Sequence, residues 1–149
     1  RPGVQVPPPR QIVMTLQAHN PEIDNAKYVS FVSFRKSGQP VATPVWIAPF
    51  EDGYGFTIES TSGKAKRLAH TSRATIQSCN VKGVITPGAT IYNCQASLVL
   101  HHRAEEVRDA IAHKYGFTYK VFSIYLWFTS RFGKSKGLPE AAVILKITP

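Results

Sequence analysis

Short runs that alternate between apolar and polar residues, separated by turn-forming residues, make up most of the chain from residue 27 to residue 100, and one more lies near its end. β-Branched and aromatic residues concentrate in these runs, and this composition favours strands. Glycine, proline, asparagine and aspartate separate one run from the next, as turns require. We therefore expect six strands, at residues 27–35, 41–48, 54–59, 73–79, 89–100 and 141–147.

Helical patterns interrupt the strands at two places. Residues 103–115 carry apolar side chains every three to four positions, and Gly116 is placed to end a helix there. A shorter helix is expected over Lys64–His70, after a turn rich in hydroxyl groups. Near the N-terminus we expect a short helix over Gln11–His19, followed by loop at Asn20–Asn25.

The aromatic-rich segment Phe117–Phe132 has no clean period of 2 or 3.6 residues, so its secondary structure is not assigned from the sequence. Two interpretations of it stay open. It serves as core or dimer interface, or it lines a pocket for a flat aromatic substrate.

The order of these elements favours an antiparallel barrel. Parallel neighbours need long crossover connections, whereas most connections here are short turns. The predicted fold class is mainly β: a closed antiparallel β-barrel of six or more strands with a few helices. Residues 1–20, which include Pro7, Pro8 and Pro9, are expected to form an N-terminal arm, and residues 21–149 a single domain.

Positive charge is concentrated in one part of the chain. The sequence holds 18 Lys and Arg against 9 Asp and Glu, and none of the acids falls between Ser60 and Ala104. Lys64, Lys66 and Arg67 lie at the start of the predicted helix, where free N–H groups already favour an anion. We interpret this stretch as a phosphate site. The alternative is a solvated basic helix capped by Ser62.

Pro44 lies inside a predicted strand. Proline in a sheet is confined to an edge or a bulge, because it cannot donate to the hydrogen-bond ladder. Such a broken edge leaves backbone N–H and C=O groups available to a ligand.

Motifs that would carry catalysis without a cofactor are missing from the sequence. There is no dinucleotide-binding glycine motif, complete phosphate loop, nucleophile elbow or pair of carboxylates, so a reaction would depend on a bound cofactor. No catalytic residue is assigned. No metal site is expected, since His101 and His102 are predicted to be neighbours in a strand that point to opposite faces.

The remaining sequence features concern location. Cys79 and Cys94 fall in predicted strands and are expected to be buried or half-buried thiols in a reducing compartment, with a disulfide between them as the open alternative. No signal peptide or apolar run of roughly 20 residues is seen. We therefore expect a cytoplasmic protein without stable membrane insertion.

Several segments, in this order and spacing, resemble the pyridoxamine 5'-phosphate oxidase-like split β-barrel superfamily, and most closely its deazaflavin oxidoreductases, which use coenzyme F420. The segments are Tyr28–Arg35, Ser37–Pro40, Thr43–Trp46, Ser62–Leu68, Cys79–Gly83 and Lys114–Gly116. The chain departs from the family pattern at Asn80, where an acidic residue is frequent, and its proline-rich arm matches nothing in the family.

The resemblance implies a homodimer with two cofactor sites at its interface. It implies that Thr43, Pro44, Val45 and Trp46 lie against the tricyclic ring, largely through backbone. It also implies that the ribityl phosphate region is held by Ser60, Ser62, Lys64, Lys66 and Arg67. The implied reaction is hydride transfer from the reduced deazaflavin to an unsaturated or conjugated small-molecule acceptor. No proton donor is identified in the sequence, which leaves solvent as a candidate.

Three other functions are alternatives to this one. The first is an FMN-binding oxidase or reductase of the same fold, and the second is a non-catalytic cofactor-binding protein. The third is a β-barrel that binds single-stranded nucleic acid, which is disfavoured because the cations bunch at one turn instead of following a strand face between aromatic residues. We therefore expect no nucleic-acid partner.

Overall fold

The computed structural model describes residues 18–131 and 141–149. The predicted helix Gln11–His19 and the predicted arm 1–20 lie outside this part except for their last residues. The described strands are β1 Tyr28–Phe34, β2 Pro40–Val45, β3 Ala48–Phe50, β4 Gly53–Ile58, β5 Arg73–Cys79, β6 Tyr92–Leu100 and β7 Ala141–Ile147. The described helices are α2 Pro21–Asp24, α3 Gly63–Leu68, α4 His101–Tyr115 and α5 Phe117–Arg131.

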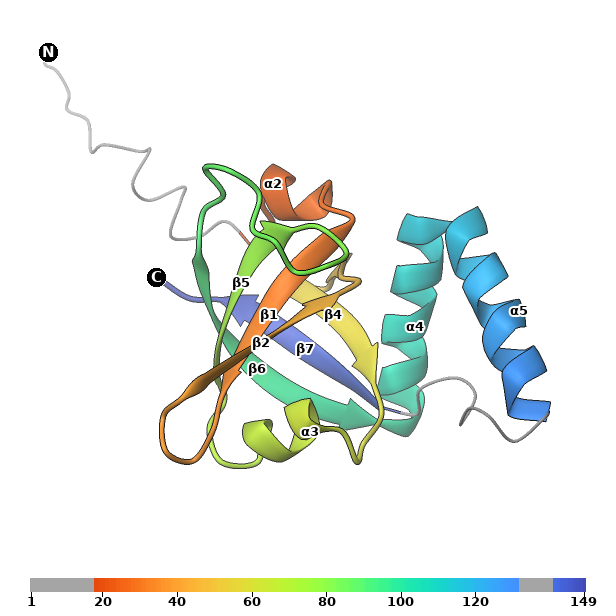
Figure 1. Cartoon of the computed structure of the whole chain (residues 1–149). Helices are drawn as coiled ribbons and strands as arrows, with labels where there is room; N and C mark the ends of the chain where they lie inside the picture. Colours follow the sequence, from red (N-terminus) through yellow and green to blue (C-terminus); the bar gives the residue numbers. More distant parts are fainter. Residues whose placement is uncertain (1–17, 132–140) are drawn as a thin grey trace, which may run out of the picture.

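All seven strands belong to one antiparallel sheet in the order β2-β1-β5-β6-β7-β4-β3. The two edge strands, β2 and β3, are consecutive in sequence, and only Trp46 and Ile47 separate them. Three Cα–Cα steps reach about 10 Å at most, so the sheet must curl until its edges meet. Figure 1 shows the resulting barrel. The predicted antiparallel β-barrel is thus confirmed, and its two edges are joined by the chain.

The predicted strand 41–48 is divided by this closure. Its first part pairs with β1 as β2, and its last residue begins β3, which pairs with β4 at the opposite edge. Pro44 lies in β2 on the edge of the sheet, where a missing backbone donor disrupts no ladder on the outer side. The prediction of an edge position for Pro44 is confirmed.

Two local predictions near the barrel ends are wrong. The predicted loop Asn20–Asn25 contains α2, because the Asn20 side chain accepts a hydrogen bond from the backbone N–H of Glu22 at 3.1 Å and Pro21 suits the first helical position. His101 and His102 begin α4 instead of continuing β6. The chain turns sharply at His101, whose φ is 55°. Within the described ranges, no three His, Cys, Asp or Glu side chains are grouped to hold a metal ion.

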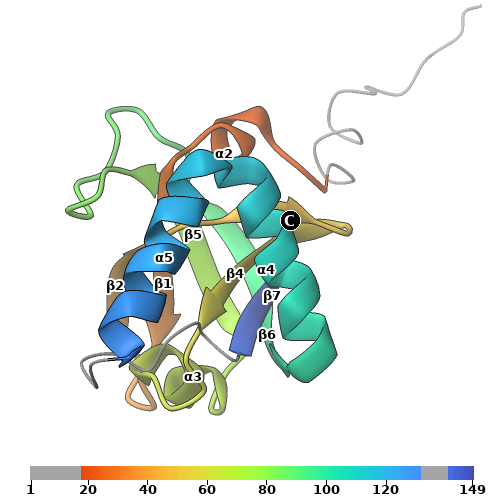
Figure 2. The same cartoon turned by 90° about the vertical axis from the view of Figure 1, so that its right-hand side faces the viewer.

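The aromatic segment forms α5. The interpretation of this segment as core is wrong for Phe117 and Ile124, whose side chains are 79% and 66% exposed. In Figure 2, α4 and α5 lie side by side over the barrel. None of the described helices combines the length and apolar content that a bilayer-spanning helix requires.

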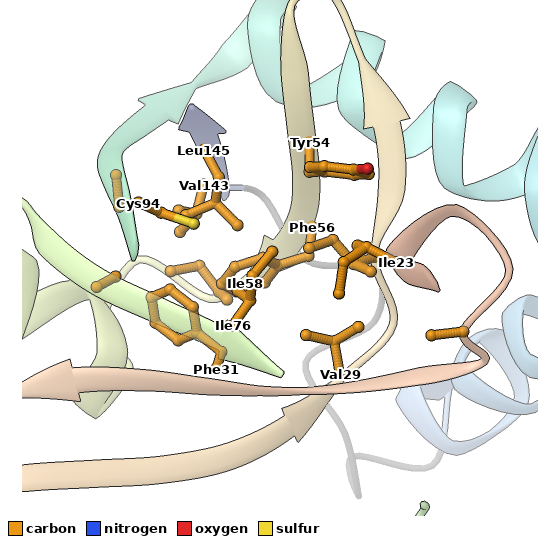
Figure 3. Close-up of a cluster of buried hydrophobic side chains, with 14 of the residues drawn as sticks. Ile23, Val29, Phe31, Tyr54, Phe56, Ile58, Ile76, Cys94, Val143 and Leu145 are labelled. Atoms are coloured by element: carbon orange, nitrogen blue, oxygen red, sulfur yellow. The ribbon is translucent and has the colours of Figure 1, made fainter. Parts of the chain in front are cut away.

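Apolar side chains from the inner faces of the strands fill the barrel (Figure 3). At its centre the rings of Phe31 and Phe56 meet edge to face, with centroids 4.8 Å apart. Cys79 and Cys94 are buried and unpaired, as predicted. Burial raises the pKa of both thiols, and that of Cys94 to about 12.

Helix α4 covers one side of the barrel through a second apolar cluster. Ala104 and Val107 are buried against Ala142 of β7. Gly55 of β4 permits this approach, since a Cβ there would lie 2.9 Å from Cγ1 of Val107. The packing brings the C-terminal end of α4 to the point where β2 passes into β3.

We expect Gly53→Ala to destabilise the fold. A Cβ at this position would lie 1.8 Å from the carbonyl oxygen of Leu145 in the neighbouring strand β7. Because backbone must move to relieve the contact, the free energy of unfolding should fall by about 1 to 3 kcal/mol or more. Urea denaturation followed by circular dichroism measures the change.

Gly63→Ala provides the comparison, since its Cβ would meet a side-chain atom, Nη1 of Arg67 at 2.9 Å, instead of backbone, and should cost less. Equal denaturation midpoints for the two variants would contradict the expected close contact between β4 and β7.

Candidate functional site

A cavity of about 590 Å³ lies between the barrel and the helices α4 and α5. Strands β1, β2 and β4 and the start of α3 supply one wall, and Ile111 of α4 with Tyr119 and Phe122 of α5 supplies the other. A cavity of this size lies within the range of cofactor and small-ligand sites. Apolar groups dominate the lining: Pro44, Val45, Trp46, Ile58, Ile111 and Phe122.

Aromatic rings form the most ordered part of this wall. The Trp46 indole stacks on the Tyr115 ring, with centroids 4.7 Å apart and an interplanar angle of 12°. Phe122 lies 5.2 Å from the same indole, and Tyr28 lies 6.5 Å from it. Trp46 is therefore held from several directions, and a flat ligand would meet a fixed surface.

The polar lining of the cavity includes Ser62 and Lys64, together with Thr57 and the carboxylate-bearing Glu59, which has an interaction of its own. The Ser62 hydroxyl accepts a hydrogen bond from the backbone N–H of Ala65 at 3.3 Å and so caps α3. Its own hydrogen remains available to a second acceptor. The cap predicted by the alternative interpretation is therefore present, and it is compatible with a ligand.

Lys64 is half-buried in the cavity lining. Burial and then the nearby positive charge of Arg67 lower the pKa of its ammonium group. No hydrogen bond or ion pair joins Lys64 to another side chain in the described part of the chain. A partly desolvated cation without a partner is stabilised by a bound anion.

A second cavity of about 400 Å³ lies on the other side of α3. It is lined by Arg35, Lys36, Ser37, Gly63, Lys66, Arg67 and His70. Arg67 is fixed there because its Nε donates to Oγ of Ser33, a fully buried residue of β1, at 2.6 Å. Burial and then the charge of Arg35 lower the pKa of the Arg67 guanidinium.

The structure divides the predicted site residues among three places. The first cavity is lined by Pro44, Val45, Trp46, Ser62 and Lys64. The second is lined by Lys66 and Arg67. Ser60 is exposed and lines neither cavity, and Thr43 lines neither, with Oγ1 buried and without a hydrogen-bond partner among the described residues.

Two residues at the C-terminal end of α4 hold the backbone of the site in place. The sequence did not identify them as site residues. The ammonium group of Lys114 donates to the carbonyl oxygens of Ala26 and Ile47, at 2.8 and 2.7 Å. The Tyr115 hydroxyl accepts from the N–H of Ile47 at 3.1 Å and donates to the carbonyl oxygen of Lys27 at 2.7 Å. Together they hold the backbone beside Trp46. No spacing rule points to these contacts, because they join residues far apart in sequence.

The aromatic lining from α5 was predicted in part. The interpretation of residues 117–132 as a pocket lining agrees with the positions of Tyr119 and Phe122. Tyr28 and Ile111 were not predicted as lining, because each fits the pattern of an ordinary strand or helix residue.

No protein-family model matches the chain, and no curated protein matches it in sequence. Solved structures do match it. The haem storage protein HutZ of Vibrio cholerae is 13% identical, with a TM-score of 0.59 and 85% of each chain covered. A pyridoxamine 5'-phosphate oxidase-related, FMN-binding protein of Nostoc punctiforme is 14% identical, with a TM-score of 0.53 and 96% of this chain and 82% of the other covered.

An F420 reductase is also similar, at 12% identity and a TM-score of 0.52, over 86% of this chain and 91% of the other. The chain therefore shares its fold with these proteins, one of which is pyridoxamine 5'-phosphate oxidase-related. Proteins of this fold thus include ones named for FMN, F420 and haem. At these identities the likeness concerns the fold, and the choice of cofactor has to be argued from the site.

We expect Lys114 to make stability depend on pH above neutrality. Burial lowers its pKa from 10.5 to about 8, partly opposed by Asp24. Between these two values the unfolded chain binds more protons than the folded one, so this group's contribution to the free energy of unfolding rises as pH rises. Below about pH 8 the ammonium group is protonated in both the folded and the unfolded chain, so the full free-energy cost of burying its charge lowers the stability of the fold.

Urea denaturation of the wild type and Lys114→Met at several pH values from 7 to 10.5 measures this effect. As pH rises from about 8 to 10.5, the unfolding free energy of the wild type should increase relative to that of Lys114→Met. Lys146→Met, at an exposed position, controls for the loss of one positive charge. A wild-type to Lys114→Met difference that stays constant with pH would contradict the assignment.

Proposed function

We propose that the chain is an oxidoreductase that uses coenzyme F420, a deazaflavin, to reduce a small unsaturated or conjugated acceptor. One observation carries the proposal. A single cavity joins the edge segment Pro44–Trp46 to Lys64, a half-buried cation that forms no ion pair with the residues the structure describes. A flat tricyclic ring bearing a phosphate on a flexible arm has this distribution of apolar surface and negative charge.

The chain's residues have distinct parts in this proposal. Backbone groups of Pro44–Trp46, at the outer edge of β2, would contact the ring, and Trp46 would be kept in position by Tyr115. Lys64 and the Ser62 hydroxyl would contact the phosphate. The bound deazaflavin would supply a hydride. The protein contributes position and electrostatics, and solvent supplies the proton.

The second cavity supports a deazaflavin over FMN. FMN has one phosphate, whereas coenzyme F420 extends beyond its phosphate into a chain with further acidic groups. Lys66 and Arg67 lie on the same helix as Lys64 and face this second cavity with Arg35, Lys36 and His70. A single phosphate would not contact all of these cations, whereas further acidic groups beyond the phosphate could pair with them.

FMN remains the second candidate, because the same cavity and the same Lys64 would serve its ring and phosphate. A non-catalytic cofactor-binding protein is the third. Haem is less well suited to the cavity: its iron takes His, Cys, Met or Tyr ligands, and the cavity lining offers only Tyr28 and Tyr119 among these. The homodimer and the cytoplasmic location remain predictions from the family resemblance and the sequence.

A side-by-side titration with coenzyme F420, FMN and haem tests the cofactor. The chain is purified from a host that makes no deazaflavin, and binding is followed by absorbance and fluorescence. We expect a colourless protein that binds F420 more tightly than FMN. A yellow protein carrying tightly bound FMN, or a strong haem absorption band with no F420 binding, would overturn the proposal.

We expect Lys64→Ala to weaken cofactor binding while the fold survives. Loss of one charge-assisted contact to a phosphate costs about 1.5 to 3 kcal/mol, or roughly a tenfold to hundredfold increase in Kd. Isothermal titration with F420 measures the change, and circular dichroism verifies folding.

Lys146→Ala is the matched control. Lys146 lies on β7, forms an exposed ion pair with Asp52 and lines neither cavity. It should bind F420 as the wild type does. Unchanged affinity in Lys64→Ala would refute the assignment of Lys64 to the phosphate.

A further inference from the structure

Helix α5 presents an exposed apolar face. Phe117, Val121, Ile124 and Tyr125 lie at helical positions i, i+4, i+7 and i+8, and their side chains are between 50% and 79% exposed. Repeats of this kind place side chains on one side of a helix. We call these four residues the α5 outer face. Clustered, exposed apolar groups of this size mark an interaction surface.

The surface is concave beside the helix. A groove of about 430 Å³ separates α5 from the Trp46 indole, and Phe117, Val121 and Tyr125 of the α5 outer face line it with Thr118 and Phe122. All of the groove's lining side chains are uncharged. The groove would accept an apolar group from whatever covers this face.

The charge around the helix narrows the choice of partner. The sequence of α5 has no Asp or Glu and carries Lys120 and Arg131, and the whole chain has a net charge of +9. Within α5, Lys120 is exposed. Exposed aromatic and aliphatic groups beside cations, without acids, match the interface of a membrane that contains anionic lipid.

A second copy of the chain fits this face less well. In a symmetric dimer the same patch meets itself, so the exposed Lys120 would approach its own copy, and α5 supplies no acid to lie between the two. An anionic lipid surface would be attracted by the same charges.

We infer that the α5 outer face binds the surface of membranes that contain anionic lipid. The helix lies along the interface, with its apolar side chains at the level of the head groups and Lys120 near the lipid phosphates. Its 15 residues extend about 22 Å, which is shorter than the hydrocarbon core, so the contact is peripheral. This inference goes beyond the proposed function and holds with or without a bound cofactor.

Vesicle flotation of the full, cofactor-free chain tests the inference. The probes are vesicles of phosphatidylcholine alone and of phosphatidylcholine with 30% phosphatidylglycerol. We expect binding to the anionic vesicles at least about tenfold tighter than to the neutral ones, and weakening as salt is raised.

The double variant Val121→Ser/Ile124→Ser should weaken that binding by roughly tenfold or more, because it removes apolar groups that become buried in the interface. Val84→Ser/Ile91→Ser changes the same residue types at similar exposures, 61% and 60%, on the loop between β5 and β6, and should bind as the wild type does.

Three results would overturn the inference. The first is equal binding to neutral and anionic vesicles, and the second is equal loss in the two double variants. The third is a dimer in sedimentation equilibrium that only Val121→Ser/Ile124→Ser dissociates, which would assign the α5 outer face to self-association.

Discussion

The two-residue connection between β2 and β3 is the constraint on which the rest of the structure depends. Trp46 and Ile47 join opposite edges of a seven-stranded sheet, so the sheet can exist only as a barrel. Ile47 is fully buried, and Lys114 and Tyr115 hold its backbone through its carbonyl oxygen and its N–H. The candidate site follows from this junction, since the edge segment, the Trp46 ring and the end of α4 are brought together by the same contacts.

Electrostatics at the site depends more on individual side chains than on the helix that carries them. Helix α3 has six residues, so its dipole is small, and Ser62 already caps it. Lys64 nevertheless lines a largely apolar cavity, where its charge has lost part of its hydration and, among the described residues, forms no ion pair. Arg67, by contrast, is fixed to buried Ser33. The same short helix thus holds Arg67 in place through the barrel, while Lys64 faces the apolar cavity.

Features that depend on local sequence were predicted well. Alternating patterns with flanking turns gave close bounds for β1, β4, β5 and β7, and Gly116 ends α4 as expected. The division of residues 41–48 into two strands was not predicted. It results from the closure of the sheet, and no residue in this segment signals it. The position of Pro44 at an edge and of Lys64 beside it could be anticipated. The contacts of Lys114 and Tyr115 with Ile47 could not, since they span 67 and 68 positions.

The two buried cysteines have a practical consequence. They are the chain's full complement of thiols, each unpaired and buried, and burial favours the protonated form that reacts poorly with alkylating reagents. The native surface therefore offers no competing nucleophilic sulfur. A cysteine placed at one chosen exposed position would accept a spin label or a fluorophore without removal of the natural residues, and distances between such probes would report how copies of the chain are arranged in solution.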